Sequence, residues 1–254
     1  MDNSSHSHPA PDAITPRFHR VVLKLSGEAL SGKGGSGIDP DEVAYLAQRI
    51  KSVYDLGVQI AVVIGAGNLW RGATGVARGM DQTTADHMGM IATVMNGLAL
   101  RDALERIGVE SRVQTAIEMN KVAEPYIRLR AIRHLDKGRV VILTGGTGNP
   151  YFTTDTGAAL RAREIDADLI IKATKVNGVY SADPNKFPDA IRYHTLTYKQ
   201  VIDQRLEVMD MTAFTLCIDS GLSILVVNFW EEGALEAAVL GQDIGTLIRA
   251  DQPA

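Results

Sequence analysis

The sequence has one cysteine, no long apolar run and no excess of positive charge, and each shortage excludes a class of protein. Cys217 alone can form neither an intramolecular disulfide nor a multi-cysteine metal site, which fits a reducing compartment. No apolar run approaches the ~18 residues of a membrane span. Lys and Arg number 26 against 30 Asp and Glu, a formal net charge of −4, so bulk positive charge does not hold nucleic acid. We expect a cytoplasmic protein with no membrane partner and no obligate nucleic acid.

The rest of the composition is that of an ordinary globular protein. The chain has 254 residues, 45% of them hydrophobic and 22% charged, so it can bury a core without metal or disulfide support. Residues 1–17 contain three prolines, three serines and few large apolar residues, which predicts a disordered tail that is not a secretory signal. Residues 18–254 are predicted to form a single domain. Glycine is abundant, with 24 residues placed mostly at the ends of apolar runs.

Two alternating periodicities define the fold class. Short β-branched apolar runs predict strands buried on both faces, at Val21–Leu25, Val58–Ile64, Val140–Leu143, Leu169–Ile171 and Ile224–Phe229. The stretches between them have helical character, at Pro40–Leu56, Asp86–Ile107, Glu124–Leu135, Asp155–Ile165 and Ala234–Leu240. Asp39 is the expected N-cap of the first helix and Gly57 follows its end. This alternation predicts an α/β protein, a three-layer α/β/α sandwich with a mostly parallel central sheet.

Ligands of such sheets bind beyond the carboxyl ends of the strands, which directs attention to two lysines. Lys24 lies inside the first predicted strand, just before Ser26 and Gly27, and Lys172 directly follows the fourth. A lysine among apolar residues is costly unless it meets an anion, although an edge-strand lysine facing water is the alternative. We expect Lys24 and Lys172 to converge on one anion.

Two glycine-rich turns resemble known phosphate-binding motifs but lack a defining residue. The stretch Gly27–Gly34 ends in glycine where a P-loop has the Ser or Thr that binds Mg²⁺, and it is too glycine-rich to begin a helix. The run Gly65–Gly72 has Trp70 where the dinucleotide fingerprint needs glycine. There remains a turn of small residues whose N–H groups can point at a phosphate, followed by Arg71, which can bind it bidentately.

The richest stretch is Thr144–Asp155, with three glycines, four threonines, an asparagine, two aromatic residues and an aspartate. It offers donors, acceptors and a stacking surface. Thr154 or Asp155 can cap the helix that follows, whose N-terminus favours an anion. Asp86 opens the second long predicted helix, either as its N-cap or as an acceptor for ribose hydroxyls.

Five motifs in order carry a resemblance to a known family. They are KLSGEAL at Lys24–Leu30, VVIGAGNLWRG at Val62–Gly72, DHMGMIATVMNGLALRDAL at Asp86–Leu104, TGNPYFTTD at Thr147–Asp155 and KATKVNGVYSADP at Lys172–Pro184. From about residue 18 to 250 the chain resembles the bacterial uridylate (UMP) kinases of the amino acid kinase superfamily. Relatives commonly have glycine where this chain has Ala66, so we expect a negative φ there.

The resemblance implies transfer of the γ-phosphate of ATP to UMP, giving ADP and UDP, in pyrimidine nucleotide biosynthesis. Such transfer needs positioning and charge neutralisation more than acid–base chemistry. The implied catalytic residues are Lys24, Asp155, Lys172 and Arg71. Mg²⁺ would enter with ATP and be held mainly by phosphates, with no side chain assigned to it, although Asp155 and Asp183 lie near enough to be candidates.

Substrate and effector residues are also implied by the resemblance. ATP would be bound by Lys24, Leu25, Ser26, Gly27, Gly67, Arg71, Thr174, Tyr180 and Asp183, in the C-terminal part of the domain. UMP would be bound in the N-terminal part by Ala66, Asp86, Thr147, Gly148, Asn149, Pro150, Tyr151, Phe152, Thr153 and Thr154, with Thr147 and Asn149 near the uracil edge. GTP activation would involve Gly32, Lys33, Gly34, Gly35, Ser36 and Gly37, with UTP as an inhibitor. Relatives are homohexamers in which the helix that carries Asp86 lies near the subunit contacts.

Other readings remain open. A carbamate, glutamate or aspartate kinase could share the fold, but Arg71, Asp86 and the 147–154 stretch suit a nucleoside monophosphate better. A nucleotide-binding or oxyanion-storage protein without catalysis would be expected to lack Lys24, Lys172 or Asp155. A Rossmann oxidoreductase is disfavoured by the failed fingerprint, and a nucleic-acid binder by the net charge.

Overall fold

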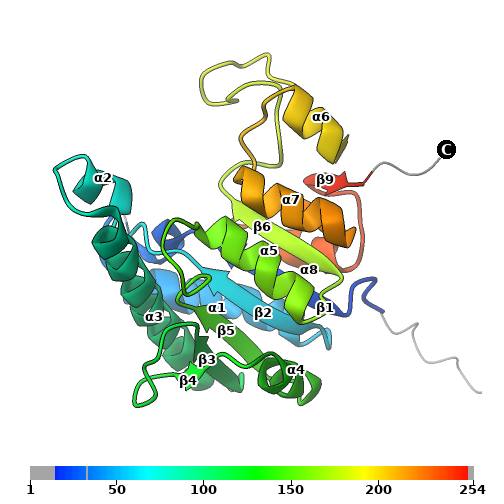
Figure 1. Ribbon diagram of the computed structural model, residues 1–254. Helices are drawn as coiled ribbons and strands as arrows, with labels where there is room; N and C mark the ends of the chain where they lie inside the picture. The colour runs from blue at the N-terminus through cyan, green and yellow to red at the C-terminus, as the bar shows by residue number, and fades with distance from the viewer. Residues whose placement is uncertain (1–14, 33, 251–254) are drawn as a thin grey trace, which may run out of the picture.

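The structure is a computed structural model that describes residues 15–32 and 34–250 (Figure 1). Most of the predicted tail (residues 1–14) and Lys33 of the glycine loop lie outside the described residues. At the end of the predicted tail, the N–H of Arg17 donates to the carbonyl of Val239 over 2.9 Å. The described chain folds around a nine-stranded sheet in the order β4-β3-β5-β2-β1-β6-β8-β9-β7.

The elements alternate along most of the chain. The strands are β1 (Arg20–Leu25), β2 (Gln59–Ile64), β3 (Ser111–Thr115), β4 (Glu124–Pro125), β5 (Val140–Thr144), β6 (Leu169–Thr174), β7 (Thr195–Thr197), β8 (Ser223–Asn228) and β9 (Thr246–Arg249). The helices are α1 (Pro40–Tyr54), α2 (Gly72–Val76), α3 (Gln82–Arg106), α4 (Arg128–Asp136), α5 (Thr154–Glu164), α6 (Tyr198–Asp203), α7 (Met211–Ser220) and α8 (Ala234–Val239), with a 3₁₀ helix, η1, at Gly27–Leu30. The five predicted strands correspond to β1, β2, β5, β6 and β8.

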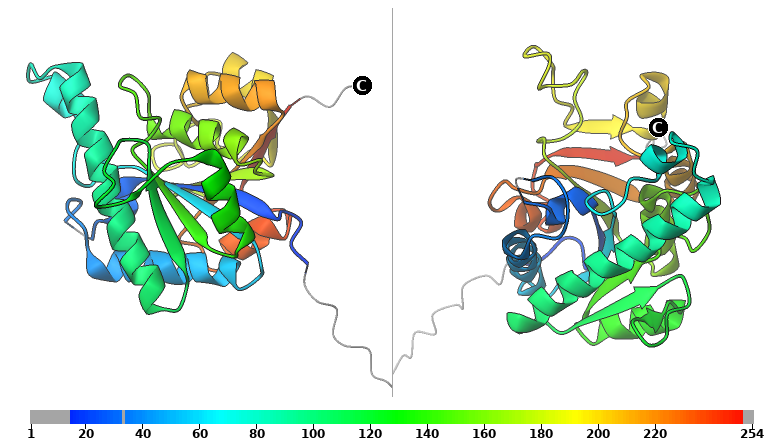
Figure 2. Two further views of the ribbon diagram at one scale, coloured as in Figure 1. Left: turned by 60° about the horizontal axis from the view of Figure 1, so that its bottom comes forward. Right: turned by 90° about the vertical axis from the view of Figure 1, so that its left-hand side faces the viewer.

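The predicted sheet type and layers are confirmed. All neighbouring strands of the sheet pair in parallel except β8 and β9, which are antiparallel to each other. Successive side chains of a strand point to opposite faces, so Leu23 and Leu25 pack with α1, α3 and α8, whereas Val22 packs with α5 and α7. Figure 2 shows these two helical layers on either side of the sheet. Because both faces are covered, the central strands read as continuous apolar runs.

Local chemistry corrects several predicted boundaries. Asp86 does not open the long helix: α3 begins at Gln82, and the N-cap is Asp81, whose carboxylate accepts from the N–H of Thr84 at 2.9 Å. The helix predicted from Glu124 begins only at Arg128, because Glu124 precedes a proline, which favours an extended backbone, and pairs with β3 instead.

Two further caps can be compared with their predictions. The N-cap of α5 is Thr153 rather than Thr154 or Asp155, and its hydroxyl accepts from the N–H of Asp155 at 3.0 Å. Asp39 is confirmed as the N-cap of α1, and Gly57 has a φ of +81° after the end of that helix. None of the helices in residues 15–32 and 34–250 is long and apolar enough to cross a membrane.

The packing of the long helix α3 against the sheet can be tested with a single substitution. Leu100 is fully buried in the cluster beneath the sheet, so Leu100→Ala leaves a cavity and is expected to lower the free energy of unfolding by about 2–5 kcal/mol. Urea unfolding followed by circular dichroism measures this. Leu129→Ala on α4, where the side chain is 69% exposed, is the control and should change it by less than about 0.5 kcal/mol. Equal losses in the two variants would contradict the packing described.

Candidate active site

Two lysines lie side by side at the carboxyl ends of the central strands β1 and β6. The parallel register of these strands pairs Lys24 with Lys172. Their side chains are 12% and 16% exposed, and both meet the carboxylate of Asp155. Lys24 Nζ lies 2.5 Å from Asp155 Oδ1, and Lys172 Nζ donates to Asp155 Oδ2 over 2.9 Å. The structure therefore brings the two predicted lysines together, with a carboxylate of the protein between them.

The position of Asp155 follows from helix α5. It is the second residue of that helix, directly behind the Thr153 cap, so the helix start holds its side chain at the strand ends. Burial alone would raise the pKa of Asp155, but the ammonium groups of Lys24 and Lys172 outweigh burial and hold the pKa below its ordinary value. Burial lowers the pKa of Lys172; Asp155 opposes this shift and Lys24 adds to it. Two cations and one anion leave a net positive charge here, which suits a polyanionic ligand.

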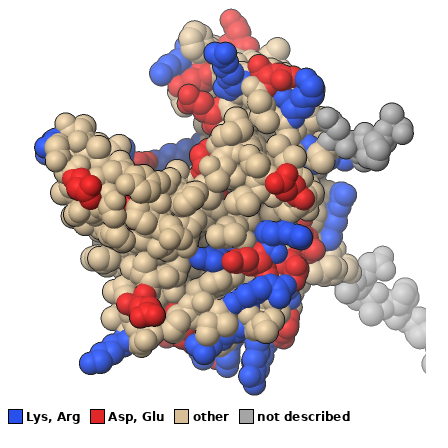
Figure 3. Space-filling view, viewed as in Figure 1, with Lys and Arg blue, Asp and Glu red and all other residues tan. Residues whose placement is uncertain are grey.

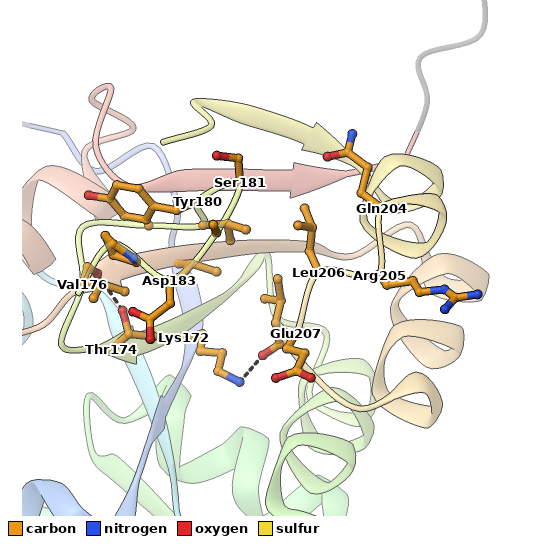
Figure 4. Close-up of a pocket in the computed structure, with 16 residues that line it drawn as sticks. Lys172, Thr174, Val176, Tyr180, Ser181, Asp183, Gln204, Arg205, Leu206 and Glu207 are labelled. Atoms are coloured by element: carbon orange, nitrogen blue, oxygen red, sulfur yellow. Dashed lines mark hydrogen bonds between the residues drawn. The ribbon is translucent and has the colours of Figure 1, made fainter. Parts of the chain in front are cut away.

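A pocket of about 510 Å³ lies on the β6 side of this cluster (Figure 4). It is lined by three predicted ATP residues, Thr174, Tyr180 and Asp183, and by the predicted catalytic residue Lys172. Its other wall, the segment 204–208 between α6 and α7, was not predicted from the sequence. Lys172 also donates to the carbonyl of Val208, which joins that wall to the lysine. We call this cavity the donor-side pocket.

A smaller cavity of about 120 Å³, the acceptor-side pocket, lies between α3, the turn after β2 and the loop after β5. Of the predicted UMP residues it is lined by Ala66, Asp86, Thr147, Asn149, Phe152, Thr153 and Thr154. Gly148, Pro150 and Tyr151 do not line it, and Tyr151 is 74% exposed with a φ of +71°. Small residues of α2 and α3 that were not predicted, Gly72, Ala85 and Gly89, complete the wall. In Figure 3 the surface is hollowed between α2 and the segment before α6, with charged side chains at the floor.

Asp86 fixes one wall of the acceptor-side pocket. Its Oδ2 accepts from the backbone N–H of Tyr151 and its Oδ1 from the amide of Gln82, each over 2.8 Å. The hydroxyls of Tyr151 and Thr83 also lie 3.2 Å apart. The loop after β5 is thereby tied to α3, and each carboxylate oxygen keeps a lone pair for a further hydroxyl.

The remaining predicted ATP residues lie outside the donor-side pocket. The side chain of Leu25 is fully buried in the core. Ser26 caps η1, and a Cβ on Gly27 would lie 2.6 Å from Asn68 Oδ1 and 2.7 Å from Gly67 N, so glycine is required for close packing of two backbone turns. Ala66 is not among the described residues with positive φ, as expected for alanine.

The glycine loop and Arg71 border a third space. Gly35, Ser36, Gly67 and Arg71 are among the residues that line this hollow of about 510 Å³. Arg71 is exposed and forms an ion pair with Glu28 of η1. Gly32 and Gly34–Gly37 form turns, and Lys33 lies outside the described residues.

Asp210 is a site residue that the sequence reading missed. Its carboxylate accepts from the hydroxyls of Thr153, over 2.5 Å, and Thr156, over 2.9 Å, and it caps α7 through the N–H of Ala213. It therefore supports the helix start that positions Asp155. The available signal was an aspartate directly before an apolar helical run, the usual pattern of an N-cap.

Thiol chemistry and a protein-built metal site find no support in the described residues. Cys217 is fully buried on α7, and burial raises the pKa of its thiol to about 12. Within residues 15–32 and 34–250 no group of three or more His, Cys, Asp or Glu side chains could hold a metal ion.

The comparison with known proteins agrees with this architecture. A sequence model of the amino acid kinase family matches residues 19–228. The chain belongs to the amino acid kinase family, a family of phosphotransferases.

Three solved structures similar to this chain are UMP or uridylate kinases. The UMP kinase of Bacillus anthracis is 41% identical, with 92% of this chain and 97% of that chain covered and a TM-score of 0.89. The UMP kinase of Ureaplasma parvum is 35% identical over 92% and 99% of the two chains, with a TM-score of 0.86. The uridylate kinase of Archaeoglobus fulgidus is 31% identical over 90% and 99%, with a TM-score of 0.69.

The ion-pair cluster predicts a change in lysine reactivity. In Asp155→Asn the main attraction that raises the pKa of Lys172 is lost, while burial, repulsion by Lys24 and the smaller attraction of Asp210 remain, so this pKa falls further. More Lys172 is then neutral at a given pH, and acylation followed by mass spectrometry should show its reactivity rising at lower pH than in the wild type. Lys51, which pairs with Asp55 on α1, is an internal control in the same digest. An unchanged or higher midpoint for Lys172 would contradict the electrostatic role of Asp155.

Proposed function

We propose that the protein is a UMP kinase that transfers the γ-phosphoryl group of Mg-ATP to UMP, giving ADP and UDP, in pyrimidine nucleotide biosynthesis. The observation that carries the proposal is the Lys24–Asp155–Lys172 cluster between two pockets. Lys172 lines the donor-side pocket, and Thr154, the neighbour of Asp155, lines the acceptor-side pocket. Donor and acceptor phosphates would meet at this cluster. The similarity to solved UMP kinases over more than nine-tenths of the chain supports the choice of acceptor.

The chemistry needs no catalytic base. The phosphate of UMP is largely ionised at neutral pH, as a second phosphate pKa of about 6 implies, so no proton has to be removed from the attacking oxygen. That oxygen attacks the γ-phosphorus, and the bond to the β–γ bridging oxygen breaks with its electron pair leaving on ADP. The ammonium groups of Lys24 and Lys172 stabilise the charge on the transferring group. Asp155, ionised and paired with both lysines, holds them in place and takes up no proton.

Each nucleotide has a pocket whose lining fits it. The larger donor-side pocket, with Thr174, Tyr180 and Asp183, would take the ATP nucleoside. In the acceptor-side pocket, Asp86 would accept from the ribose hydroxyls, and Thr147 and Asn149 would face the uracil edge. Arg71 at the start of α2 would leave Glu28 for the UMP phosphate. These assignments divide one domain, residues 18–254, into a UMP-binding N-terminal part and an ATP-binding C-terminal part.

Magnesium fits this site as a companion of ATP. Mg²⁺ retains phosphate and water ligands readily, so it does not require a cluster of protein carboxylates. When bound, it would neutralise phosphate charge beside the lysines.

Assembly and regulation complete the proposal. We propose a cytoplasmic homohexamer, supported by three apolar side chains of α3, those of Met88, Ile91 and Met95, which are 38%, 46% and 50% exposed. GTP activation through the 32–37 loop and inhibition by UTP are proposed from the resemblance of that segment to bacterial relatives.

The acceptor is tested by ADP release from Mg-ATP with UMP, CMP, dUMP, glutamate and carbamate supplied separately. The proposal predicts turnover with UMP. Turnover with glutamate or carbamate instead would keep the family and overturn the substrate. Tight ATP binding without turnover on any acceptor would indicate a storage or regulatory protein.

Lys24 is the simplest residue on which to test the phosphoryl-transfer role. Lys24→Ala should lower kcat by about 10²–10³-fold, the cost of losing one preorganised donor, while the thermal unfolding midpoint stays close to that of the wild type. Steady-state kinetics with UMP measure the loss. Lys51→Ala, which removes a lysine paired with Asp55 on the surface of α1, is the matched control and should keep normal turnover. Near-normal turnover of Lys24→Ala would refute the role.

A further inference from the structure

Two asparagines form a buried amide pair under the acceptor-side turn. Asn68 and Asn96 are 3% and 0% exposed. Asn68 Nδ2 donates to Asn96 Oδ1 over 3.0 Å, and Asn96 Nδ2 donates back to Asn68 Oδ1 over 2.8 Å. The second donor of Asn68 reaches the carbonyl of Gly37, and that of Asn96 reaches the carbonyl of Gly65, each over 2.8 Å. All four side-chain N–H groups of the pair are therefore hydrogen-bonded.

The pair holds the turn after β2, residues 65–67. Gly65 is fixed through its carbonyl by Asn96 and through its N–H by the carbonyl of Leu25, over 3.0 Å. Gly27 packs so closely on Asn68 Oδ1 that a Cβ there would lie 2.6 Å from it. The N–H groups of Ala66 and Gly67, in contrast, donate to no acceptor in the described part of the chain. Gly65 is thus held by the protein, and the N–H groups of Ala66 and Gly67 are free to bind a ligand.

The position of Asn96 on α3 gives this contact a consequence for the acceptor-side pocket. Asp86, on the same helix, holds the loop after β5 through Tyr151. Asn96, just under three turns further along, holds the opposite wall, which includes Ala66. One rigid helix therefore sets the distance between both walls. Packing does not require an amide at this position, because leucine has a similar size and the neighbouring residues Ala92 and Leu100 are buried and apolar.

We propose that Asn96 is a positioning residue of the reaction: through Asn68 and the carbonyl of Gly65 it fixes the 65–67 turn, so that the N–H group of Ala66, which lines the acceptor-side pocket, points at the acceptor phosphate. The identity of that acceptor as UMP rests on the proposed function. Asn96 itself touches no substrate and acts only through the turn. Its loss should weaken acceptor binding selectively, because the donor-side pocket has none of these contacts.

The test compares three variants of the full chain. Asn96→Leu leaves the Gly65 carbonyl, the Oδ1 of Asn68 and one N–H of Asn68 without partners, although Asn68 still donates to Gly37. Asn68→Leu with Asn96→Leu removes both amides and leaves fewer buried polar groups unsatisfied, so the double variant should be the more stable of the two. Both should raise the KM for UMP by about tenfold with the KM for ATP unchanged. Gln114→Leu, which removes another fully buried amide on β3, is the matched control and should change neither KM.

A second readout is independent of activity. Amide hydrogen exchange of the peptide containing residues 65–67 should become faster in both asparagine variants and stay unchanged in the control. A merely structural role would lower kcat through loss of active protein while both KM values stay constant, and that result, or unchanged exchange, would overturn the proposal. If the wild type does not phosphorylate UMP, the proposed function fails, and the exchange result alone then decides the positioning role.

Discussion

The ion-pair cluster of Lys24, Asp155 and Lys172 is the constraint around which the rest of the structure is arranged. Two ammonium groups in a mostly buried place repel one another, and the Asp155 carboxylate between them makes the arrangement stable. The parallel pairing of β1 with β6 places the lysines opposite each other, and the start of α5 supplies the carboxylate. Because the cluster retains net positive charge, it can stabilise a phosphoryl group carrying several negative oxygens.

The surrounding elements place on either side of that charged cluster the two pockets that we propose for the two nucleotides. Helix α3 supports both walls of the acceptor-side pocket, through Asp86 and Asn96. The segment before α7 contacts Lys172 through Val208 and the start of α5 through Asp210. The start of α5 is therefore linked to both pockets, because Thr154 lines the acceptor-side pocket and Asp155 pairs with Lys172 of the donor-side pocket.

Much of the architecture was predictable from the sequence, because the buried parallel strands are continuous apolar runs and the caps use ordinary residues such as Asp39. The outer strands were harder: β3, which lies next to the edge strand β4, is the mixed sequence SRVQT, and its pairing with β5 is visible only in three dimensions. The start of helix α3 was predicted four residues too late, because Asp81 and Asp86 are the same residue type and the sequence alone does not show which of them caps the helix. At the site, Lys24 and Lys172 followed from their positions near the ends of predicted strands, whereas the role of Asp155 was implied only by the resemblance to UMP kinases. The support from Asp210 and the Asn68–Asn96 pair did not follow from the sequence, because each joins segments that lie far apart in the chain.

The most direct test of the central claim, that one cluster serves both nucleotides, is the affinity of a bisubstrate compound in which adenosine and uridine are joined through a polyphosphate bridge. Calorimetric titration should show that it binds much more tightly than ATP or UMP alone and competes with both, since its bridge would cross the Lys24–Lys172 pair. Lys24→Ala should lose most of that gain. A compound that binds no more tightly than ATP, or that leaves the UMP site free, would contradict the account.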